Sequence, residues 1–569
     1  MNVRRMLVLL TFALGVAALG ASSSAHGATL GGTWVSTSTQ ALNLNGTLLG
    51  SAPAGEQLEI SAVLPLRNSS SIASAIESGT ILTPDQVAAA YGPTTSQVQA
   101  VEGYLSSNGF TNVSASSNGL LVSGNATVAQ AEQAFNTSIS TYSLGGKSVY
   151  ANTAAAQVPS SLGGDVVALL GLSDVPMSIP TPAVSTPDLD GFGPKAVANA
   201  YDDSSMKPAT GTTTAIITSG DMTSTIANLR FAEKQFGEPQ VPVSVIYDGP
   251  QAGIVNNNPL TGSLEWDLDT QISTMVPKAV KQLDIYDVAT FTDPEVARGI
   301  NMFVSQDKAT ALSASLGECD YIAFLDGAML TTDEALAEGA LQGQSMFGST
   351  GDNGYACPEV ASTGVPEGPP GVSWPADGAY TTAVGGTTLL ADSNGNVQNE
   401  IAWIGGGGGI SPFETAEPWT LQANTAGQTW EFTNQGGRGV PDVSALADSN
   451  TPYLVYGDDT PGTTPEGVGG TSVSSPLTMG LWASVESAHG NRLGLAQYDF
   501  YNLYDQVNPA TTESAPTGPV YVANSNPQPV TGFRDITLGT NGGCVAKSGY
   551  DYCTGIGSLQ AAALSTQFK

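Results

Sequence analysis

Histidine is nearly absent from this 569-residue chain, which contains only His26 and His489. His26 lies in an amino-terminal leader, so His489 is the one imidazole left for a mature protein. A nucleophilic serine normally needs a neighbouring base to take its proton, and histidine is the usual one. If a serine in this chain is a catalytic nucleophile, its base is therefore either His489 or a residue other than histidine.

Basic residues are scarce as well. The chain has 17 Lys and Arg against 50 Asp and Glu, a formal net charge of −33. Such a balance excludes nucleic acid as an expected partner, because polyanions would be repelled. Free Asp and Glu titrate at about 3.9 and 4.3, so this charge falls sharply in acid. The composition fits a protein that works in acid, or simply an acidic exported protein.

Long apolar runs are missing apart from one at the start. Residues 1–27 combine two arginines, an apolar run and small residues, the pattern of a secretory signal peptide. The run is short for a membrane anchor, so we expect a secreted, extracellular protein with no membrane anchor.

Only four cysteines are present: Cys319, Cys357, Cys544 and Cys553. They permit three disulfide connectivities, and proximity in sequence favours pairing the first two and the last two. An exported protein meets an oxidising environment, which favours disulfides. No CxxC pair occurs, so a zinc site is not expected.

Residues 28–187 are expected to form a small α+β domain and a linker. Alternating strands and two capped helices, beginning at Thr83 and Thr127, give a ferredoxin-like order of β-α-β-β-α-β, with a last strand pair near 140–152. A stretch with five prolines between 173 and 195 then marks a domain boundary.

Residues 188–569 alternate apolar strands with helical patterns. Strands are expected at 212–220, 242–249 and 311–317, and helices at 225–237, 263–276 and 333–348. This alternation predicts an α/β domain with a parallel sheet flanked by helices, whose site lies at the carboxyl ends of the strands. The run of glycines at 405–409 predicts a loop of close backbone approach.

Ser472 lies in "GGTSVSSPLTMG", where Pro476 predicts the start of a helix. The free amides at a helix amino terminus stabilise developing negative charge, which suits a nucleophile. Glu265 and Asp269 lie four residues apart on a second predicted helix and project from one side. Two carboxyls this close share a proton and titrate together. A carboxylate near pKa 4 is still charged in mild acid, where an ordinary imidazole is protonated, and so offers the missing base.

These residues give the chain its resemblance to a known family. "GTSVSSP" around Ser472 and "EWDLD" around Glu265 and Asp269 resemble the sedolisin family of serine-carboxyl peptidases, in particular its kumamolisin-like members. Further similar segments are "FGSTGDNG" with Asp352, "SASLG" at 313–317, "AVGGT" at 383–387 and "GRGVPDVSALAD" at 437–448. The first domain resembles the family's activation propeptide.

The resemblance implies a subtilisin-like catalytic domain with a Ser-Glu-Asp triad. It assigns Ser472 as nucleophile, Glu265 as general base, Asp269 as its orienting partner and Asp352 as the oxyanion-hole donor. It also implies one structural Ca²⁺ held by the side chains of Asp535 and Asp551 and by the carbonyls of Ile536, Lys547 and Gly549. The chain departs from the pattern at Leu316, where a tryptophan is common, and at Asn353, where a serine is common.

The sequence therefore predicts a secreted, acid-acting endopeptidase made as a zymogen and matured by its own activity. Its partners would be protein or peptide substrates and its own propeptide, whose interface is expected to weaken in acid, and it would be a monomer. A tripeptidyl-peptidase of the same family and a catalytically silent binding protein are the alternatives. A Ser-His-Asp enzyme is not favoured, because His489 follows Ser472 at a helix end, and no D-T-G or D-S-G turn of an aspartic protease occurs.

Overall fold

The computed structural model describes residues 33–177 except 43, 182–185, 191–248, 260–357 except 262, 370–420, 437–457, and 464–569 except 516, 517, 523 and 525. The expected leader, residues 1–27, lies outside these residues. Residues 34–569 cluster as one unit. No helix in the described residues has the length and apolar character needed to cross a bilayer.

The amino-terminal part is an α+β domain around an antiparallel sheet in the order β4-β5-β3-β9. Its helices and strands are β1 (Trp34–Ser36), β2 (Thr47–Ser51), β3 (Gln57–Val63), α1 (Ile72–Glu77), α2 (Pro84–Ala90), α3 (Thr95–Ser107), β4 (Thr111–Ala115), β5 (Leu121–Thr127), α4 (Val128–Ala134), β6 (Ile139–Leu144), β7 (Lys147–Asn152), β8 (Gln157–Pro159) and β9 (Ala168–Leu170). The order of β3, α3, β4, β5, α4 and β9 is ferredoxin-like, as predicted. Capping boxes begin α2 at Thr83 and α4 at Thr127.

Two details of this domain differ from the prediction. The fourth strand of the ferredoxin-like sheet is β9, which pairs with β3. The hairpin expected to supply it, β6–β7, pairs instead with β2 in a separate sheet. The crossover helix is α3 rather than α2. Buried Val101 and Leu105 on α3 join the core of this domain, whereas buried Val87 on α2 joins the core of the larger domain.

The larger domain is built on an eight-stranded sheet in the order β12-β13-β11-β14-β16-β18-β19, with β22 paired to β18. The strands are β11 (Ala209–Ser219), β12 (Val243–Tyr247), β13 (Val280–Val288), β14 (Ala311–Ala314), β16 (Ser345–Ser349), β18 (Thr381–Ala391), β19 (Val397–Ala402) and β22 (Val443–Leu446). All pairings are parallel except β18 with β19. The predicted parallel sheet is thus confirmed, and its strands are buried because helices cover both faces.

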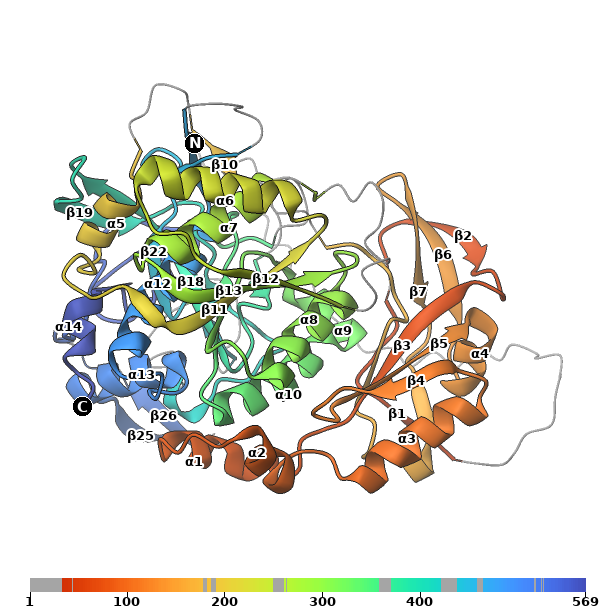
Figure 1. The fold of residues 1–569 in the computed structure, drawn as a ribbon. Coiled ribbons are helices and arrows are strands. Elements are labelled where there is room, and N and C mark those ends of the chain that lie inside the picture. The colour runs from red at the N-terminus through yellow and green to blue at the C-terminus, as the bar shows by residue number, and fades with distance from the viewer. Residues whose placement is uncertain are drawn as a thin grey trace, which may run out of the picture. The chain divides into compact units, whose positions relative to one another are not determined.

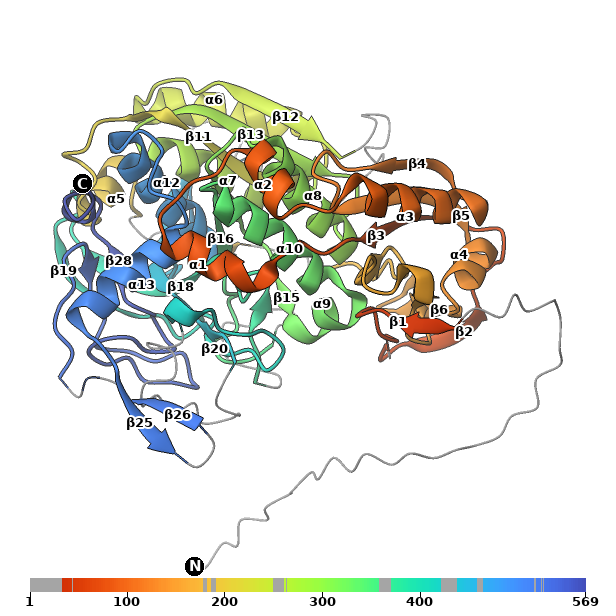
Figure 2. The same cartoon turned by 90° about the horizontal axis from the view of Figure 1, so that it is seen from below.

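Helices α6 (Thr223–Phe236), α7 (Leu264–Met275) and α12 (Thr471–Ala488) pack on one face, and α8 (Asp293–Gln306) and α10 (Ala328–Leu341) on the other (Figures 1 and 2). Residues 345–348, predicted as the end of a helix, belong to strand β16 instead. Helix α12 begins at Thr471, so Pro476 lies inside it and Ser472 is in its first turn. Both disulfides favoured by proximity are present, Cys319–Cys357 and Cys544–Cys553.

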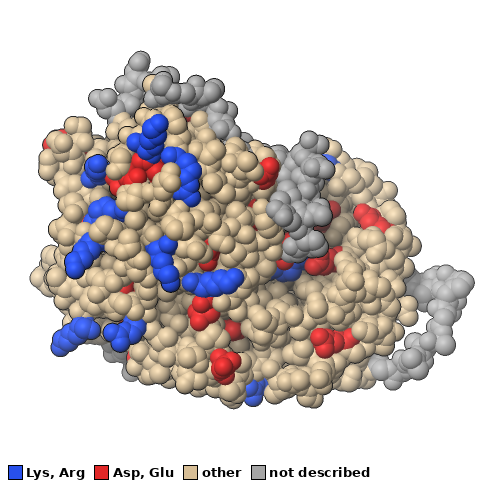
Figure 3. All heavy atoms as spheres, in the orientation of Figure 1, with Lys and Arg blue, Asp and Glu red and all other residues tan. Residues whose placement is uncertain are grey.

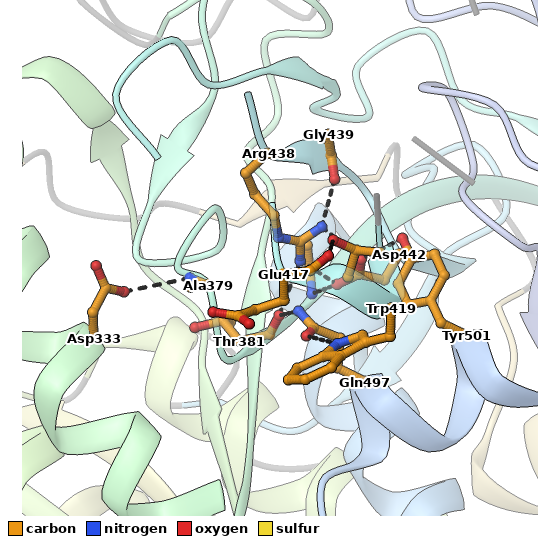
Figure 4. Close-up of polar contacts among 12 residues, drawn as sticks. Asp333, Ala379, Thr381, Glu417, Trp419, Arg438, Gly439, Asp442, Gln497 and Tyr501 are labelled. Carbon is orange, nitrogen blue, oxygen red and sulfur yellow. Dashed lines mark hydrogen bonds and ion pairs between the residues drawn. The ribbon is translucent and has the colours of Figure 1, made fainter. Parts of the chain in front are cut away.

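A buried ion pair ties the chain segments around β18 and β22 together (Figure 4). The fully buried Arg438 guanidinium contacts both carboxylate oxygens of Asp442, at 2.7 and 2.6 Å. Asp442 also accepts the hydroxyl of Tyr501 at 2.6 Å and the N–H of Ala383, on β18, at 2.7 Å. These partners satisfy the hydrogen-bonding capacity of the buried Asp442 carboxylate. Loss of the Arg438 guanidinium would leave the negative charge of Asp442 buried without a cation to compensate it.

We predict that Arg438→Met lowers the free energy of unfolding by about 3–5 kcal/mol at pH 6, because Asp442 is left as an unpaired buried charge. Urea unfolding in a Ser472→Ala background, which prevents self-digestion, would measure this. The matched control is Lys195→Met, which breaks a pair to Glu238 at 3.9 Å from a lysine with a 78% exposed side chain. That change should cost less than about 1 kcal/mol. Equal small losses in both variants would contradict the role of the Arg438 pair.

Candidate functional site

The predicted site residues come from helix starts and strand ends at one edge of the large sheet. Ser472 is the second residue of α12 and Glu265 the second residue of α7. Ser315 directly follows β14, and Asp352 follows β16 after a two-residue turn. Parallel α/β sheets collect strand carboxyl ends and helix amino termini at the same edge, which is why residues so distant in sequence converge here.

Glu265 is fully buried, and neither carboxyl oxygen has a hydrogen-bond partner among the described residues. Burial raises its pKa well above the ordinary value, and the charges of Asp269 and Asp352 raise it further. The Ser472 hydroxyl lowers this pKa, which places the predicted nucleophile beside the predicted base. A buried, unpartnered carboxyl is costly and marks a site where another group binds or reacts.

Asp269 lies one turn further along α7 and is also fully buried. Its Oδ1 accepts the hydroxyl of Ser315 at 2.6 Å, whereas its Oδ2 has no partner among the described residues. Burial raises the pKa of Asp269 well above its ordinary range, and the Ser315 bond opposes this. The sequence argument assumed a carboxylate near pKa 4, but burial of the pair favours at least one retained proton.

Ser315 also compensates for the proline in α12. Its Oγ lies 3.2 Å from the carbonyl oxygen of Ser472. In a regular helix the amide of residue 476 would donate to that carbonyl, but Pro476 has no N–H. A single hydroxyl therefore contacts both the backbone of the predicted nucleophile and the carboxyl of Asp269.

Asp352 is held by the residue next to Ser472. Its Oδ1 accepts the backbone N–H of Thr471 at 2.7 Å and the hydroxyl of Thr471 at 2.9 Å. Burial raises the pKa of Asp352, while these two bonds lower it. The loop that carries Asp352 lies against the glycine run, as predicted: a Cβ on Gly407 would come within 1.8 Å of the carbonyl oxygen of Thr350.

Other predicted residues take structural positions. His489 caps the carboxyl end of α12, and its Nε2 lies 3.0 Å from both the carbonyl and hydroxyl oxygens of Ser565. Asp267, on a different side of α7 from Glu265, accepts the amide of Asn228 on α6. Leu316 is 2% exposed.

Of the predicted calcium ligands, Lys547, Gly549 and Asp551 lie in the loop closed by Cys544–Cys553, and Asp535 and Ile536 precede it. Asp535 Oδ2 accepts from Ser548 and from the Gly549 N–H, at 3.0 and 3.1 Å, and its buried Oδ1 has no partner among the described residues. Asp551 is 1% exposed, and its Oδ2 accepts the Lys547 N–H at 2.8 Å. The free Asp535 oxygen and the buried Asp551 carboxyl fit an oxygen-seeking cation such as Ca²⁺. Within the described residues, the one cluster of three candidate metal-ligand side chains contains the disulfide-bonded Cys319 and Cys357, which cannot bind as thiolates.

Sequence reasoning did not single out Ser315 or Thr471. Both belong to quoted motifs, "SASLG" and "GTSVSSP", but their hydroxyls act on carboxyls 46 and 119 residues away. The only signal in the sequence was indirect, since a proline six residues into a helix needs a substitute donor for the freed carbonyl.

Comparison with known proteins places the chain in a family. The family model "Pro-kumamolisin, activation domain" matches residues 45–175. Sedolisin from Pseudomonas sp. (strain 101) is 34% identical over 91% of this chain and 88% of its own length. Xanthomonalisin from Xanthomonas sp. (strain T-22) is 30% identical over 96% of this chain and 70% of its own length.

A solved structure agrees. "Pseudomonas sedolisin (serine-carboxyl proteinase) complexed with two molecules of pseudo-iodotyrostatin" is 32% identical with a TM-score of 0.56, and covers 67% of this chain and 98% of that one. On this similarity in sequence and fold, together with the matched activation domain, the chain belongs to the sedolisin family and carries the family's propeptide.

Proposed function

We propose that this protein is a secreted, acid-acting serine-carboxyl endopeptidase made as a zymogen. The observation that carries the proposal is the buried Glu265 carboxyl with the Ser472 hydroxyl beside it at the start of a helix. Of the described residues no imidazole lies there, since His489 is at the other end of α12. Membership of the sedolisin family supports the same reaction.

In the proposed reaction, Ser472 Oγ attacks the carbonyl carbon of the scissile peptide bond while Glu265 takes its proton. The tetrahedral oxyanion accepts a hydrogen bond from protonated Asp352. Glu265 then gives its proton to the leaving amine, which leaves an acyl-enzyme on Ser472, and water reverses these steps to release the acid. An ionised Asp352 would repel the oxyanion, so the reaction needs acid.

The pair Glu265–Asp269 would work as a monoanion. Asp269 Oδ1 accepts from Ser315, so a proton on Asp269 would sit on the free Oδ2. Asp269 would keep that proton and donate a hydrogen bond through it to Glu265, which leaves Glu265 as the charged base, the orienting role of a third triad member. Since burial disfavours two adjacent negative charges, loss of the second proton would be delayed to higher pH.

The linker supports maturation within one molecule. Pro176 pairs antiparallel with Thr292, and the Met177 N–H donates to the carbonyl of Phe291 at 3.0 Å. The Phe291 ring lies 6.0 Å from that of Trp266, the neighbour of Glu265. Further along, β10 (Ala183–Val184) pairs antiparallel with β24 (Glu466–Gly469), the strand that leads into α12. The linker thus contacts the neighbours of both the base and the nucleophile.

The propeptide interface contains glutamates that respond to acid in the direction opposite to the prediction. Glu334 accepts the Leu66 N–H at 2.7 Å, and Glu338 accepts the amide of Asn118 at 3.0 Å. Burial raises the pKa of each glutamate to about 7. Departure of the propeptide would expose both and lower their pKa, so the complex binds more protons than the separated parts, and acid strengthens these two contacts. We infer that cleavage of the linker, rather than their protonation, frees the propeptide.

We predict that the purified precursor converts itself at pH 4 to a shorter form whose new amino terminus lies on the amino-terminal side of Ala183. Residues 183–185 pair with β24 and would remain with the leaving amine. Ser472→Ala should abolish conversion, and Glu265→Gln should slow it by roughly 10³-fold or more, because the base is lost. Intact-mass spectrometry over time would measure the change.

Conversion of the Ser472→Ala precursor with no other protease present would refute the assignment of the nucleophile. Normal conversion of Glu265→Gln would refute that of the base. Asp267→Asn, which alters a carboxyl bound to Asn228, is the matched control and should mature at a nearly normal rate. Release of tripeptides alone from a long peptide would instead favour a tripeptidyl-peptidase; three such peptidases match 38% or 39% of this chain at 26–30% identity.

Many acidic groups of the larger domain are buried rather than displayed. On the face drawn in Figure 3 most of the described surface is neither acidic nor basic, and Lys and Arg gather over the region of α5 (Pro194–Ala200) and α6. Burial raises the pKa of Asp333, which faces Glu414, and that of Glu318, to about 7 in each case. Burial also raises the pKa of Glu414 and that of Asp377 well above the ordinary range.

We predict that the fold loses stability between about pH 4 and 7. The folded pKa values lie above the unfolded ones, so the folded state binds more protons across this window and stability falls as pH rises. Urea midpoints of the Ser472→Ala precursor at pH 4, 5, 6 and 7 would measure the slope. Asp333→Asn, which cannot ionise, should flatten it. A midpoint that rises steadily with pH would contradict the prediction.

We propose that the loop closed by Cys544–Cys553 holds one structural Ca²⁺ through the side chains of Asp535 and Asp551 and the carbonyls of Ile536, Lys547 and Gly549. The unpartnered Oδ1 of Asp535 supports this assignment. A bound cation would neutralise the two carboxyls and fix the loop.

Removal of Ca²⁺ with a chelator should then lower the melting temperature of the Ser472→Ala precursor by a few degrees at pH 6, because a ligand that binds only the folded state stabilises it. Asp535→Asn should have the lower melting temperature already and should not respond to added Ca²⁺. Asp392→Asn, at an exposed turn whose carboxyl caps nearby amides, is the control and should keep the response. An unchanged melting temperature of the parent protein at saturating Ca²⁺ and in chelator would argue against the site.

A further inference from the structure

Thr471 donates two hydrogen bonds to the carboxyl of Asp352, the proposed oxyanion donor, and accepts one from the backbone of Gly351. Its backbone N–H and its hydroxyl both point at Asp352 Oδ1, at 2.7 and 2.9 Å. Its hydroxyl oxygen also accepts the Gly351 N–H at 3.0 Å. The side chain is 1% exposed, so water does not compete for these bonds.

The directions of these bonds follow from counting protons. A threonine hydroxyl has one proton and two lone pairs. The Gly351 N–H can only donate, so it takes one lone pair of the hydroxyl, whose proton stays available for Asp352. Oδ1 of Asp352 therefore receives two hydrogen bonds, one from the backbone and one from the side chain of the same residue. An oxygen that accepts twice in this way is a poor place for the acidic proton of a neutral carboxyl.

The other oxygen of Asp352 has the opposite surroundings. The two hydrogen bonds from Thr471 both fall on Oδ1, and a Cβ on Gly470 would lie only 2.7 Å from Oδ2. Gly470 has φ +118°, a conformation that L side chains rarely adopt, so the position is restricted to glycine on two grounds. The missing side chain leaves Oδ2 bare on the side of the chain that leads to Ser472.

We propose that Thr471 is a positioning residue that places the acidic proton of Asp352 on Oδ2, the oxygen free to donate to the oxyanion. The inference rests on the proposed role of Asp352 as the oxyanion donor, and it adds a residue that determines which oxygen of Asp352 carries the proton. A neutral carboxyl carries its proton on either oxygen, and only one of the two placements gives a donor in the site. Thr471 removes the unproductive placement before substrate arrives, which is preorganisation of the donor.

The electrostatic surroundings of Asp352 are simple. Both Thr471 bonds stabilise its ionised form, and burial opposes ionisation. The charged group that interacts with it is Glu265, whose own pKa Asp352 raises. Loss of the Thr471 hydroxyl should therefore have two effects at once: the proton is no longer directed, and the carboxylate is less stabilised, so Asp352 holds its proton to higher pH.

The test compares Thr471→Val, which keeps the shape and removes the hydroxyl, with Thr471→Ser, which keeps the hydroxyl. After self-maturation and active-site titration, kcat and KM for a peptide substrate are measured from pH 3 to 7. Thr471→Val should lower kcat about 10-fold, less than loss of a whole oxyanion donor, with KM within about twofold. Its alkaline limb of kcat should move to higher pH. Thr471→Ser should keep the parent kcat and the parent limb.

Equal profiles for Thr471→Val and Thr471→Ser would overturn the inference, as would a lower kcat with an unmoved alkaline limb, which indicates a packing defect alone. If Thr471→Val does not fold, Thr471→Ala carries the same expectation. Asp352→Ala, which has no side-chain donor, separates the proposed oxyanion role from the placement of the proton. Parent activity in Asp352→Ala would remove the proposed oxyanion role itself, whereas a large loss there with no effect of Thr471→Val would remove only the placement of the proton.

Discussion

The arrangement depends on one constraint: two carboxyl groups, Glu265 and Asp269, are buried side by side on one helix without a cation among the described residues to neutralise them. Ionising both carboxyls would place two negative charges side by side in the interior, which is unfavourable, so the fold favours a state in which the pair shares one proton. In the proposed reaction, that single constraint lets a carboxylate serve as the base in place of histidine and restricts the chemistry to acid, and it accounts for the serine and threonine hydroxyls around these carboxyls. A hydroxyl can hydrogen-bond to a carboxyl in either its neutral or its ionised form, whereas a lysine or arginine would hold that carboxyl in the ionised form.

Acidity is a property of the whole larger domain and not of the site alone. Asp333 faces Glu414 in the interior much as Glu265 faces Asp269, so each pair brings two carboxyls together. Asp442 instead faces the guanidinium of Arg438, a group of opposite charge. The interior thus contains proton-sharing carboxyl pairs as well as the compensated Arg438–Asp442 ion pair. The carboxyl pairs adapt the folded state to acid, and the ion pair connects the segments around β18 and β22.

The sequence was sufficient for the parts that depend on local patterns. The apolar positions of α7 placed Glu265 and Asp269 on one side of a helix, and the capping residues placed the starts of α2 and α4. The sequence was not sufficient where the fold depends on which strands pair with one another in a sheet. Strand β9 has three residues and no alternation to reveal it, so the longer β6–β7 hairpin was assigned its place in the sheet. Pro476 suggested a helix start, but the helix begins at Thr471, and the Ser472 carbonyl that Pro476 leaves without a helical donor lies 3.2 Å from the Ser315 hydroxyl.

The most direct test of the central claim is the charge state of the buried pair itself. Isotope-edited infrared spectra of the Ser472→Ala protein would count protonated carboxyls at pH 6, where exposed Asp and Glu are ionised. The account predicts one protonated carboxyl fewer in the double variant Glu265→Gln/Asp269→Asn than in the parent, because the buried pair retains one proton at that pH. A parent spectrum with both carboxyls fully ionised at that pH would contradict it.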